Sequence, residues 1–157
     1  ALLPPLNPLT VTLGITNISF VAQIVDWNAQ LRHEVIRMAH EHKGTSFVRI
    51  IQRCPVYVES IGKALQDEPA RMQLLTHEKG VQVGDAVKRQ FPNHAEHDPS
   101  DIHAARELAE NESVLPLGIL YHNPDAPRYD TMSAVGLEMT AEEKLAGLNE
   151  ALDHFAI

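Results

Sequence analysis

Scarcity of several residue types narrows the classes of protein to which this chain can belong. Its 157 residues include one cysteine, Cys54, so a disulfide-stapled secreted scaffold is excluded. No apolar run reaches the roughly 20 residues that a membrane-spanning helix needs, so no membrane association is expected. Aromatic residues make up 5% of the chain, charged residues 22% and hydrophobic residues 44%. This composition is typical of a globular domain with a hydrophobic core.

Basic residues are also scarce, with 13 Lys and Arg against 21 Asp and Glu and a net charge of −8. Nucleic-acid-binding proteins usually carry a basic stripe, whereas the basic residues here are scattered, so no nucleic-acid partner is predicted. The first residues, Ala1-Leu2-Leu3-Pro4-Pro5, lack an initiator Met, a basic region and a small-residue cleavage site. We therefore expect no signal peptide, a cytoplasmic location, and a chain that begins inside a longer protein.

Two apolar segments flank an amphipathic one in the first third of the sequence. Ile18–Val25 is nearly all apolar and rich in β-branched residues, which is typical of a strand buried on both faces. Ala29–Lys43 places apolar residues at helical spacing, and Gly44 ends that pattern. Ser46–Gln52 is a second apolar segment with a strand pattern. The order predicts a βαβ unit with adjacent or near-adjacent parallel strands, and hence an α/β fold.

The remaining elements give weaker signals. The polar stretch Thr76–Asp101 has little periodicity, which predicts an extended arm or long loop that packs on another subunit. Four further elements are expected: a short helix at Leu9–Leu13, a helix from Ser100 or Asp101 to Ala109, a strand at Leu115–Tyr121 whose Pro116 marks a sheet edge, and a helix from Thr140 to about His154 that opens with the capping-box pair Thr140 and Glu143.

Cys54 is the strongest candidate for chemistry. It follows the second predicted strand, at the carboxyl edge where open α/β sheets bind ligands. A single cysteine is most often a small buried hydrophobic residue. It can also be a nucleophile, or one ligand of a metal centre whose other ligands lie elsewhere. The residues alone leave these alternatives open.

A run of metal-ligand residue types comes later in the chain: His94, His97, Asp98, Asp101 and His103. These are usual ligands of zinc and other divalent metals, so the run could form a metal site. The structural alternative is a solvated acidic loop that leads into a helix, with Asp98 or Ser100 as its cap. The second interpretation is favoured.

Several blocks of the chain follow one another in the order found in a known family. The blocks are Asn7-Pro8-Leu9, Phe20-Val21-Ala22, His42-Lys43-Gly44-Thr45-Ser46-Phe47-Val48, Gln52-Arg53-Cys54-Pro55-Val56-Tyr57, Leu75-Thr76-His77-Glu78-Lys79-Gly80, His97-Asp98, Leu115-Pro116-Leu117-Gly118 and Pro127-Arg128-Tyr129. They resemble the C-terminal half of the β subunit of 2-oxoacid:ferredoxin oxidoreductases, most closely the 2-oxoglutarate-like branch. The resemblance extends to about Met132, and residues 133–157 match no part of it.

The resemblance implies a fold and an activity. Residues 1–66 would be half of a thiamine-diphosphate-binding domain, residues 67–132 a C-terminal arm, and residues 133–157 a helix of unknown role. The whole enzyme would oxidatively decarboxylate a 2-oxoacid with coenzyme A and pass electrons through a [4Fe-4S] cluster to ferredoxin. Its cofactors would be thiamine diphosphate, Mg²⁺ and the cluster. Its partners would be the N-terminal half of the β subunit, the α subunit and ferredoxin.

Cys54 occupies the position of the family's fourth cluster cysteine. The diphosphate motif and the other three cluster cysteines have no counterpart in this sequence, so this chain alone is expected to be inactive. Two further functions stay open: a non-catalytic acidic α/β module that binds another subunit, and a His/Asp divalent-metal-binding domain.

Overall fold

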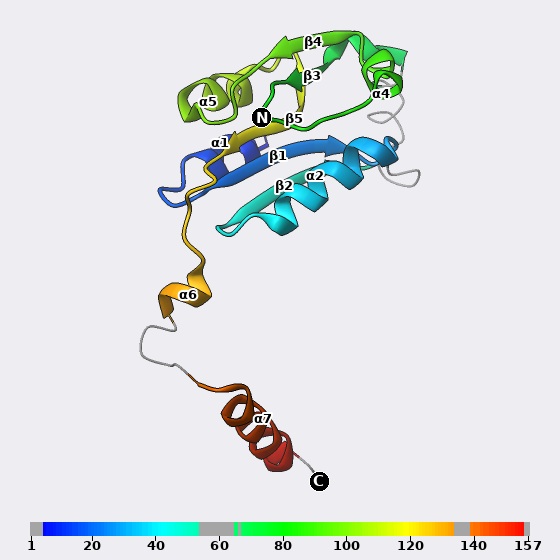
Figure 1. The fold of residues 1–157 in the computed structure, drawn as a ribbon. Coiled ribbons are helices and arrows are strands. Elements are labelled where there is room, and N and C mark those ends of the chain that lie inside the picture. Colours follow the sequence, from blue (N-terminus) through cyan, green and yellow to red (C-terminus); the bar gives the residue numbers. More distant parts are fainter. Residues whose placement is uncertain (1–4, 54–64, 66, 134–138, 156–157) are drawn as a thin grey trace. The chain divides into compact units, whose positions relative to one another are not determined.

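The structure, a computed structural model, describes residues 5–53, 65, 67–133 and 139–155 (Figure 1). Residues 1–126 form one compact unit, and residues 127–157 form a second. The first unit contains a mixed sheet whose strands lie in the order β2-β1-β5-β3-β4. The strands are β1 (Phe20–Val25), β2 (Ser46–Ile51), β3 (Met72–Thr76), β4 (Asn93–Glu96) and β5 (Leu115–His122). Neighbouring strands are parallel except for the β1–β5 pair, which is antiparallel.

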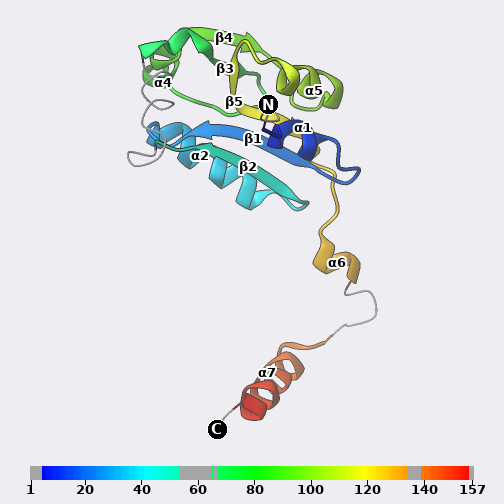
Figure 2. The same ribbon diagram turned by 180° about the vertical axis from the view of Figure 1, so that it is seen from behind.

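Helices cover both faces of this sheet. In the first unit they are α1 (Pro8–Leu13), α2 (Ala29–Glu41), the short 3₁₀ helix η1 (Pro69–Arg71), α4 (Asp85–Gln90) and α5 (Ile102–Glu110). Apolar residues of α2 and α4 share one buried cluster, while those of α1 and α5 share another. Successive strand residues point to opposite faces, and Phe20 and Val21 of β1 belong to different clusters. The two views show α2 and α1 on opposite sides of β1 and β2 (Figures 1 and 2).

The predicted βαβ unit is confirmed. β1 and β2 pair in parallel from Phe20↔Ser46 to Val25↔Ile51, and α2 connects them. The Asn28 side chain caps α2 by accepting a hydrogen bond from the Leu31 backbone N–H at 2.8 Å. The short helix α1 is confirmed as well.

The segment around Pro116 forms the predicted strand, but the prediction that this strand lies at a sheet edge is wrong. β5 lies in the middle of the sheet, between β1 and β3. The β1–β5 ladder ends at Gln23↔Gly118, before it reaches Pro116. There the Gln23 side-chain amide donates to the Pro116 carbonyl oxygen at 2.7 Å. Proline is tolerated because the side on which it lacks an N–H is served by a side chain instead of a strand.

Thr76–Asp101 is not the predicted arm or loop. It contains α4 and β4, and β4 pairs in parallel with β3. Val81, Val87 and Phe91 from this stretch are at most 5% exposed and belong to the core. Val87 and Phe91 are four positions apart, a helical spacing, but the segment is too short and too polar for its pattern to predict a helix. The predicted division into residues 1–66, 67–132 and 133–157 refers to the domains of a larger enzyme, and it stays a prediction.

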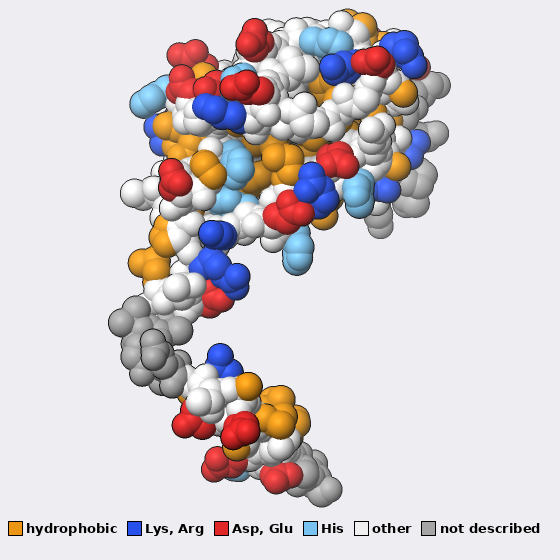
Figure 3. Space-filling model, in the orientation of Figure 1, with side chains coloured by type: hydrophobic (Ala, Val, Ile, Leu, Met, Phe, Trp, Pro, Cys, Tyr) orange, Lys and Arg blue, Asp and Glu red, His pale blue; other side chains and the backbone are white. Residues whose placement is uncertain are grey.

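The second unit contains α6 (Tyr129–Ser133) and α7 (Ala141–Phe155). The predicted capping box opens α7: Thr140 N–H donates to the Glu143 carboxylate at 2.6 Å, and Glu143 N–H donates to Thr140 Oγ1 at 3.2 Å. Leu145, Leu148 and Leu152 are more than half exposed and form an apolar patch on α7 (Figure 3). Within the described ranges, no helix has the length and apolar character needed to cross a membrane.

Candidate functional site

The carboxyl ends of β1 and β2 lie at the same edge of the sheet because the two strands are parallel. Asp26 directly follows β1, and its backbone N–H donates to the Ile51 carbonyl oxygen at 3.0 Å. Arg53 follows β2 after a single intervening residue. This is the edge at which open α/β sheets bind ligands.

Asp26 and Arg53 are joined by two hydrogen bonds. The Arg53 backbone N–H donates to Asp26 Oδ2 at 3.3 Å, and Arg53 Nε donates to Asp26 Oδ1 at 3.2 Å. Side-chain exposure is 23% for Asp26 and 51% for Arg53. An ion pair this open contributes at most about 1 kcal/mol. The backbone bond has a further effect, because it holds the main chain of residue 53 against the end of β1.

Two other side chains complete this edge. Arg32, in the first turns of α2, donates to the Asp26 carbonyl oxygen. The Arg53 guanidinium carbon lies 5.6 Å from the centroid of the Trp27 ring, within cation–π range. Trp27 itself packs on the core cluster that includes α2. The Asp26 carboxylate therefore holds the Arg53 main chain, Trp27 contacts the Arg53 side chain, and Arg32 of α2 bonds the Asp26 main chain.

Cys54 lies outside the described residues, and the neighbouring groups bear on what it could bind. A [4Fe-4S] cluster takes four thiolates, and this chain supplies one. Arg32 and Arg53 outnumber the single carboxylate of Asp26 at the described part of this edge. Such a charge balance suits an anionic thiolate-bound centre. The donor set fits one ligand of a shared cluster, and it does not fit a complete metal site within this chain.

The acidic residues of the predicted His/Asp run have local structural roles. Asp101 caps α5 by accepting from the backbone N–H groups of His103 and Ala104 at 2.8 and 3.1 Å. Asp98 accepts from the Ser100 backbone and hydroxyl at 2.9 and 2.7 Å. These bonds, with a smaller contribution from Lys79, lower the pKa of Asp98 to about 2. The cap is Asp101, one of the two residues, Ser100 and Asp101, predicted to begin this helix.

The histidines of the run point to separate backbone partners. His97 is 6% exposed, and its Nε2 lies 2.6 Å from the Leu120 carbonyl oxygen. His94 Nε2 lies 3.0 Å from the Lys88 carbonyl oxygen. Across the part of the chain that the structure describes, no three His, Cys, Asp or Glu side chains are grouped as a metal site requires.

A second cluster of titratable groups was not predicted. His42 follows α2, and His122 ends β5. Their ring centroids lie 5.1 Å apart, and each ring also contacts Phe20 at 5.6 and 5.3 Å. Burial lowers the pKa of both imidazoles, and the neighbouring His122 adds to the effect on His42. No sequence motif joins positions so far apart, so only the β1–β5 register could have revealed the pair.

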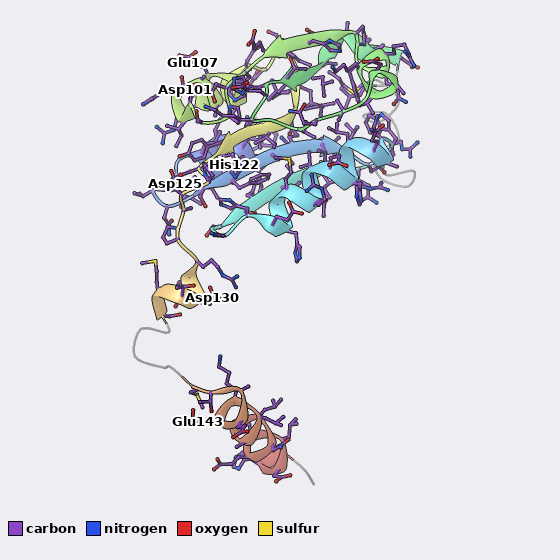
Figure 4. The ribbon with its side chains drawn as sticks, in the orientation of Figure 1. Asp101, Glu107, His122, Asp125, Asp130 and Glu143 are labelled. Carbon is purple, nitrogen blue, oxygen red and sulfur yellow. The ribbon has the colours of Figure 1, made fainter. Side chains whose placement is uncertain are left out.

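His122 also borders a hollow of about 450 Å³ that includes Lys79, Ser100 and Asp125. Figure 4 shows His122 at the end of β5 and Asp125 on the segment that follows it. Ser19 Oγ lies 2.8 Å from His42 Nε2 and donates to the Thr45 carbonyl oxygen at 3.2 Å. These contacts join the start of β1 to the α2–β2 turn. These contacts are structural, and they form no nucleophile–base–acid arrangement among themselves.

Comparison with known proteins adds independent observations. A family model described as the C-terminal region of the pyruvate ferredoxin oxidoreductase beta subunit matches residues 88–135. The 2-oxoglutarate oxidoreductase subunit KorB of Mycobacterium tuberculosis is 32% identical over 79 residues, which are 50% of this chain and 21% of that protein. Subunit beta of 2-oxoacid:ferredoxin oxidoreductase 2 from Aeropyrum pernix is 28% identical over 118 residues, which are 75% of this chain and 35% of that protein.

One solved structure has a fold similar to that of this chain. It is a 2-oxoglutarate:ferredoxin oxidoreductase from Magnetococcus marinus, with 2-oxoglutarate, coenzyme A and succinyl-CoA bound. The TM-score is 0.59 at 25% identity, and the match covers 92% of this chain and 44% of that one. The resemblance to β subunits of 2-oxoacid oxidoreductases is confirmed. The chain spans less than half the length of each of these relatives.

The β-subunit family signature lies in one half of the sheet. Residues 88–135 include β4, α5 and β5, the part of the chain for which the sequence pattern was least informative. Cys54 and the Asp26–Arg53 pair lie outside that matched segment. The match to this family model therefore leaves the role of Cys54 a prediction.

Proposed function

We propose that this chain is part of the β subunit of a 2-oxoglutarate-like 2-oxoacid:ferredoxin oxidoreductase. The whole enzyme decarboxylates a 2-oxoacid oxidatively with coenzyme A, yields an acyl-CoA and carbon dioxide, and passes electrons to ferredoxin. The observation that carries this proposal is the structural match over 92% of the chain to a 2-oxoglutarate:ferredoxin oxidoreductase. The relatives from Mycobacterium tuberculosis and Aeropyrum pernix support the same class of substrate.

Within that enzyme, we assign Cys54 as one thiolate ligand of a [4Fe-4S] cluster. Support comes from the place of Arg53, which is fixed at the carboxyl edge of β1 and β2 by Asp26. A residue next to a fixed main-chain position presents its sulfur to a site assembled from distant segments with little loss of conformational entropy. The guanidinium groups of Arg32 and Arg53 offset the negative charge of a thiolate-bound centre.

The other cofactors belong to the parent enzyme. Thiamine diphosphate supplies carbanion chemistry, Mg²⁺ holds its diphosphate, and the cluster carries single electrons. This chain has one cysteine and supplies one ligand, so the remaining half of the β subunit and the α subunit must provide the rest. We infer that the chain alone is inactive and that ferredoxin is the partner that receives the electrons.

The test is Cys54→Ser in the assembled enzyme that contains this chain, studied without oxygen. Changing residues that only support a metal ligand typically costs 10–100-fold in metal affinity or activity, so losing a ligand should lower ferredoxin reduction by roughly tenfold or more. Iron and sulfide content and the reduced-state electron paramagnetic resonance spectrum should change, while circular dichroism should not. Ser46→Ala on β2 is the control, since its hydroxyl donates to the Ala39 carbonyl oxygen, away from the carboxyl end of the strand.

An unchanged iron content and spectrum in Cys54→Ser would show that the cysteine is a structural thiol. A second candidate function, a non-catalytic interaction module, is favoured by the exposed leucines of α7. Metal analysis of the native complex separates the two, because the interaction module needs no iron or sulfide. Zinc in place of iron would instead support the His/Asp metal-binding alternative.

A further inference from the structure

Charge is distributed unevenly along this chain, whose net charge is −8. Residues 1–25 contain no charged side chain, and residues 26–53 contain five Lys or Arg and three Asp or Glu. Residues 54–157 contain eight Lys or Arg and 18 Asp or Glu. The part that forms β1, α2 and β2 is therefore the basic part of an acidic protein. An asymmetry of this kind indicates where a charged partner is steered.

The outward side of α2 combines basic, histidine and apolar side chains. Its exposed residues, which we call the α2 face, border a hollow of about 570 Å³ and are Ala29, Arg32, His33, Ile36, Arg37 and His40. They recur every three or four positions and so lie on one side of the helix, whereas Leu31 and Val35 are buried. Figure 3 shows basic and histidine side chains over α2, with acidic ones beside them.

Two glutamates border the α2 face, and both bind Arg37. Arg37 Nη2 lies 3.0 Å from Glu34 Oε2, and Arg37 Nη1 lies 2.8 Å from Glu41 Oε2. The Arg37 side chain is 47% exposed, and ion pairs this open contribute little stability. A carboxylate of a partner protein can therefore replace them at little cost. No acidic side chain is among those that line the hollow itself.

The α2 face begins at the edge of the sheet that precedes the proposed cluster ligand. Arg32 belongs to the face and donates to the Asp26 carbonyl oxygen, while the Asp26 carboxylate bonds Arg53, the residue before Cys54. A protein that docks on α2 therefore lies beside this edge. Ile36, which is 42% exposed, supplies an apolar contact among basic side chains. Protein interfaces have this composition, with an apolar centre and enrichment in Arg.

We propose that the α2 face is a docking surface for ferredoxin, which binds it through an acidic patch. This inference rests on the proposed function, in which ferredoxin receives the electrons. A docked, oxidised ferredoxin accepts one electron from the reduced cluster of the parent enzyme and leaves in the reduced form. Transient electron-transfer complexes have small interfaces, below about 1,200 Å². One helix face with an apolar centre and basic neighbours suits such a complex.

Kinetics of the assembled enzyme with two electron acceptors test the docking. Arg37→Gln and Ile36→Glu should each lower kcat/KM for an acidic ferredoxin by roughly tenfold, through KM, because charge complementarity sets the association rate. Reduction of methyl viologen, a small acceptor that needs no docking surface, should stay unchanged. The decline of the ferredoxin rate with ionic strength should also be shallower in Arg37→Gln, since salt screens the attraction that this residue provides.

Matched controls place the same chemical changes elsewhere on the chain. Arg89→Gln removes an exposed guanidinium from α4, and Val11→Glu adds a carboxylate at a 54% exposed position of α1, on the other side of β1. Both should keep normal ferredoxin kinetics. Unchanged kinetics in the α2 variants, or equal losses in the controls, would overturn the proposal. Failure of the α2 variants to assemble would do the same, because the face would then be an interface within the enzyme.

A binding measurement without turnover separates this inference from the proposed function. A gallium-substituted ferredoxin cannot be reduced, and calorimetry measures its Kd for the assembled enzyme. Weaker binding in Arg37→Gln and Ile36→Glu, with normal binding in both controls, would support the α2 face even if Cys54→Ser kept its iron. Equal binding in all four variants, together with loss of iron in Cys54→Ser, would defeat the α2 face and leave the cluster assignment in place.

Discussion

The half of the sheet formed by β1 and β2 differs from the half formed by β3, β4 and β5. In the first half, a strand, an amphipathic helix and a strand follow one another with strong periodicity. In the second half, the strands are shorter or interrupted by proline, and α4 has only six residues. Both halves nevertheless contain parallel pairs.

The antiparallel pairing of β1 with β5 has a consequence for ligand binding. Because the two halves run in opposite directions, their carboxyl ends lie at opposite sides of one sheet. One such edge is held by Asp26 and Arg53, and the other borders the hollow next to His122. Open α/β sheets bind ligands at carboxyl ends, so this arrangement gives the chain two candidate edges instead of one.

The largest expected effect on stability comes from core substitutions that test whether the two halves unfold together. Phe20 and Phe91 lie in different halves, are at most 1% exposed and share one buried cluster. Phe20→Ala and Phe91→Ala should each lower the free energy of unfolding by about 3–5 kcal/mol. Urea denaturation followed by circular dichroism measures this. Ile36→Ala, at a position that is 42% exposed, is the control. A small effect of Phe91→Ala alone would mean that the halves are independent.

A substitution at Gly118 tests whether the backbone is strained in β5, the strand that joins the two halves of the sheet. It is the glycine with a positive φ, 121°, among the described residues, and a Cβ there would lie 3.4 Å from Leu75. Gly118→Ala should destabilise the chain by about 1–3 kcal/mol, the usual cost of a strained backbone conformation. Gly80→Ala is the control, because its Cβ would meet only ordinary contacts. Equal melting temperatures for the two variants would show that the junction is not strained.

The contact between His42 and His122 predicts that folding stability depends on pH. The pKa values of His42 and His122 are lowered in the folded state, so below about pH 6.5, the unperturbed value, the unfolded chain binds more protons. Stability should therefore fall as the pH drops from about 6.5 towards the folded-state pKa values. Denaturation at several pH values measures the slope. His122→Phe should reduce it, while His40→Gln, on exposed α2 surface, should not. An unchanged slope in His122→Phe would exclude the cluster as its source.

Sequence reasoning succeeded where local patterns determine structure. The βαβ unit and the Thr140–Glu143 capping box each depend on residues close together in the chain. It failed where long-range pairing decides. Pro116 indicated an edge strand, but the Gln23 side chain and the end of the β1 ladder make an interior position possible. Val87 and Phe91 are core residues of a six-residue helix and its cap, a segment too short for periodicity to predict.

In the candidate site, too, the features set by local sequence were predictable and those set by long-range contacts were not. The place of Arg53 just past the carboxyl end of β2 was predictable because the βαβ pattern makes β1 and β2 parallel. The bond from Asp26 to Arg53 was not, since it joins residues separated by 27 positions through a side chain. The His42–His122 contact likewise requires the antiparallel register of β1 and β5.

The smallest effect concerns the Asp26–Arg53 pair, and it distinguishes positioning from charge. Asp26→Ala removes both hydrogen bonds, whereas Arg53→Gln removes the side-chain bond and leaves the Arg53 backbone N–H bonded to Asp26. Each should lower global stability by about 1 kcal/mol or less, as is usual for exposed pairs. Local exchange should separate them: the amide of residue 53 should lose hydrogen-exchange protection in Asp26→Ala and keep it in Arg53→Gln. Arg37→Gln, which removes the surface pairs with Glu34 and Glu41, is the control for the loss of a guanidinium. Equal protection of residue 53 in all three variants would mean that Asp26 does not hold the main chain before Cys54.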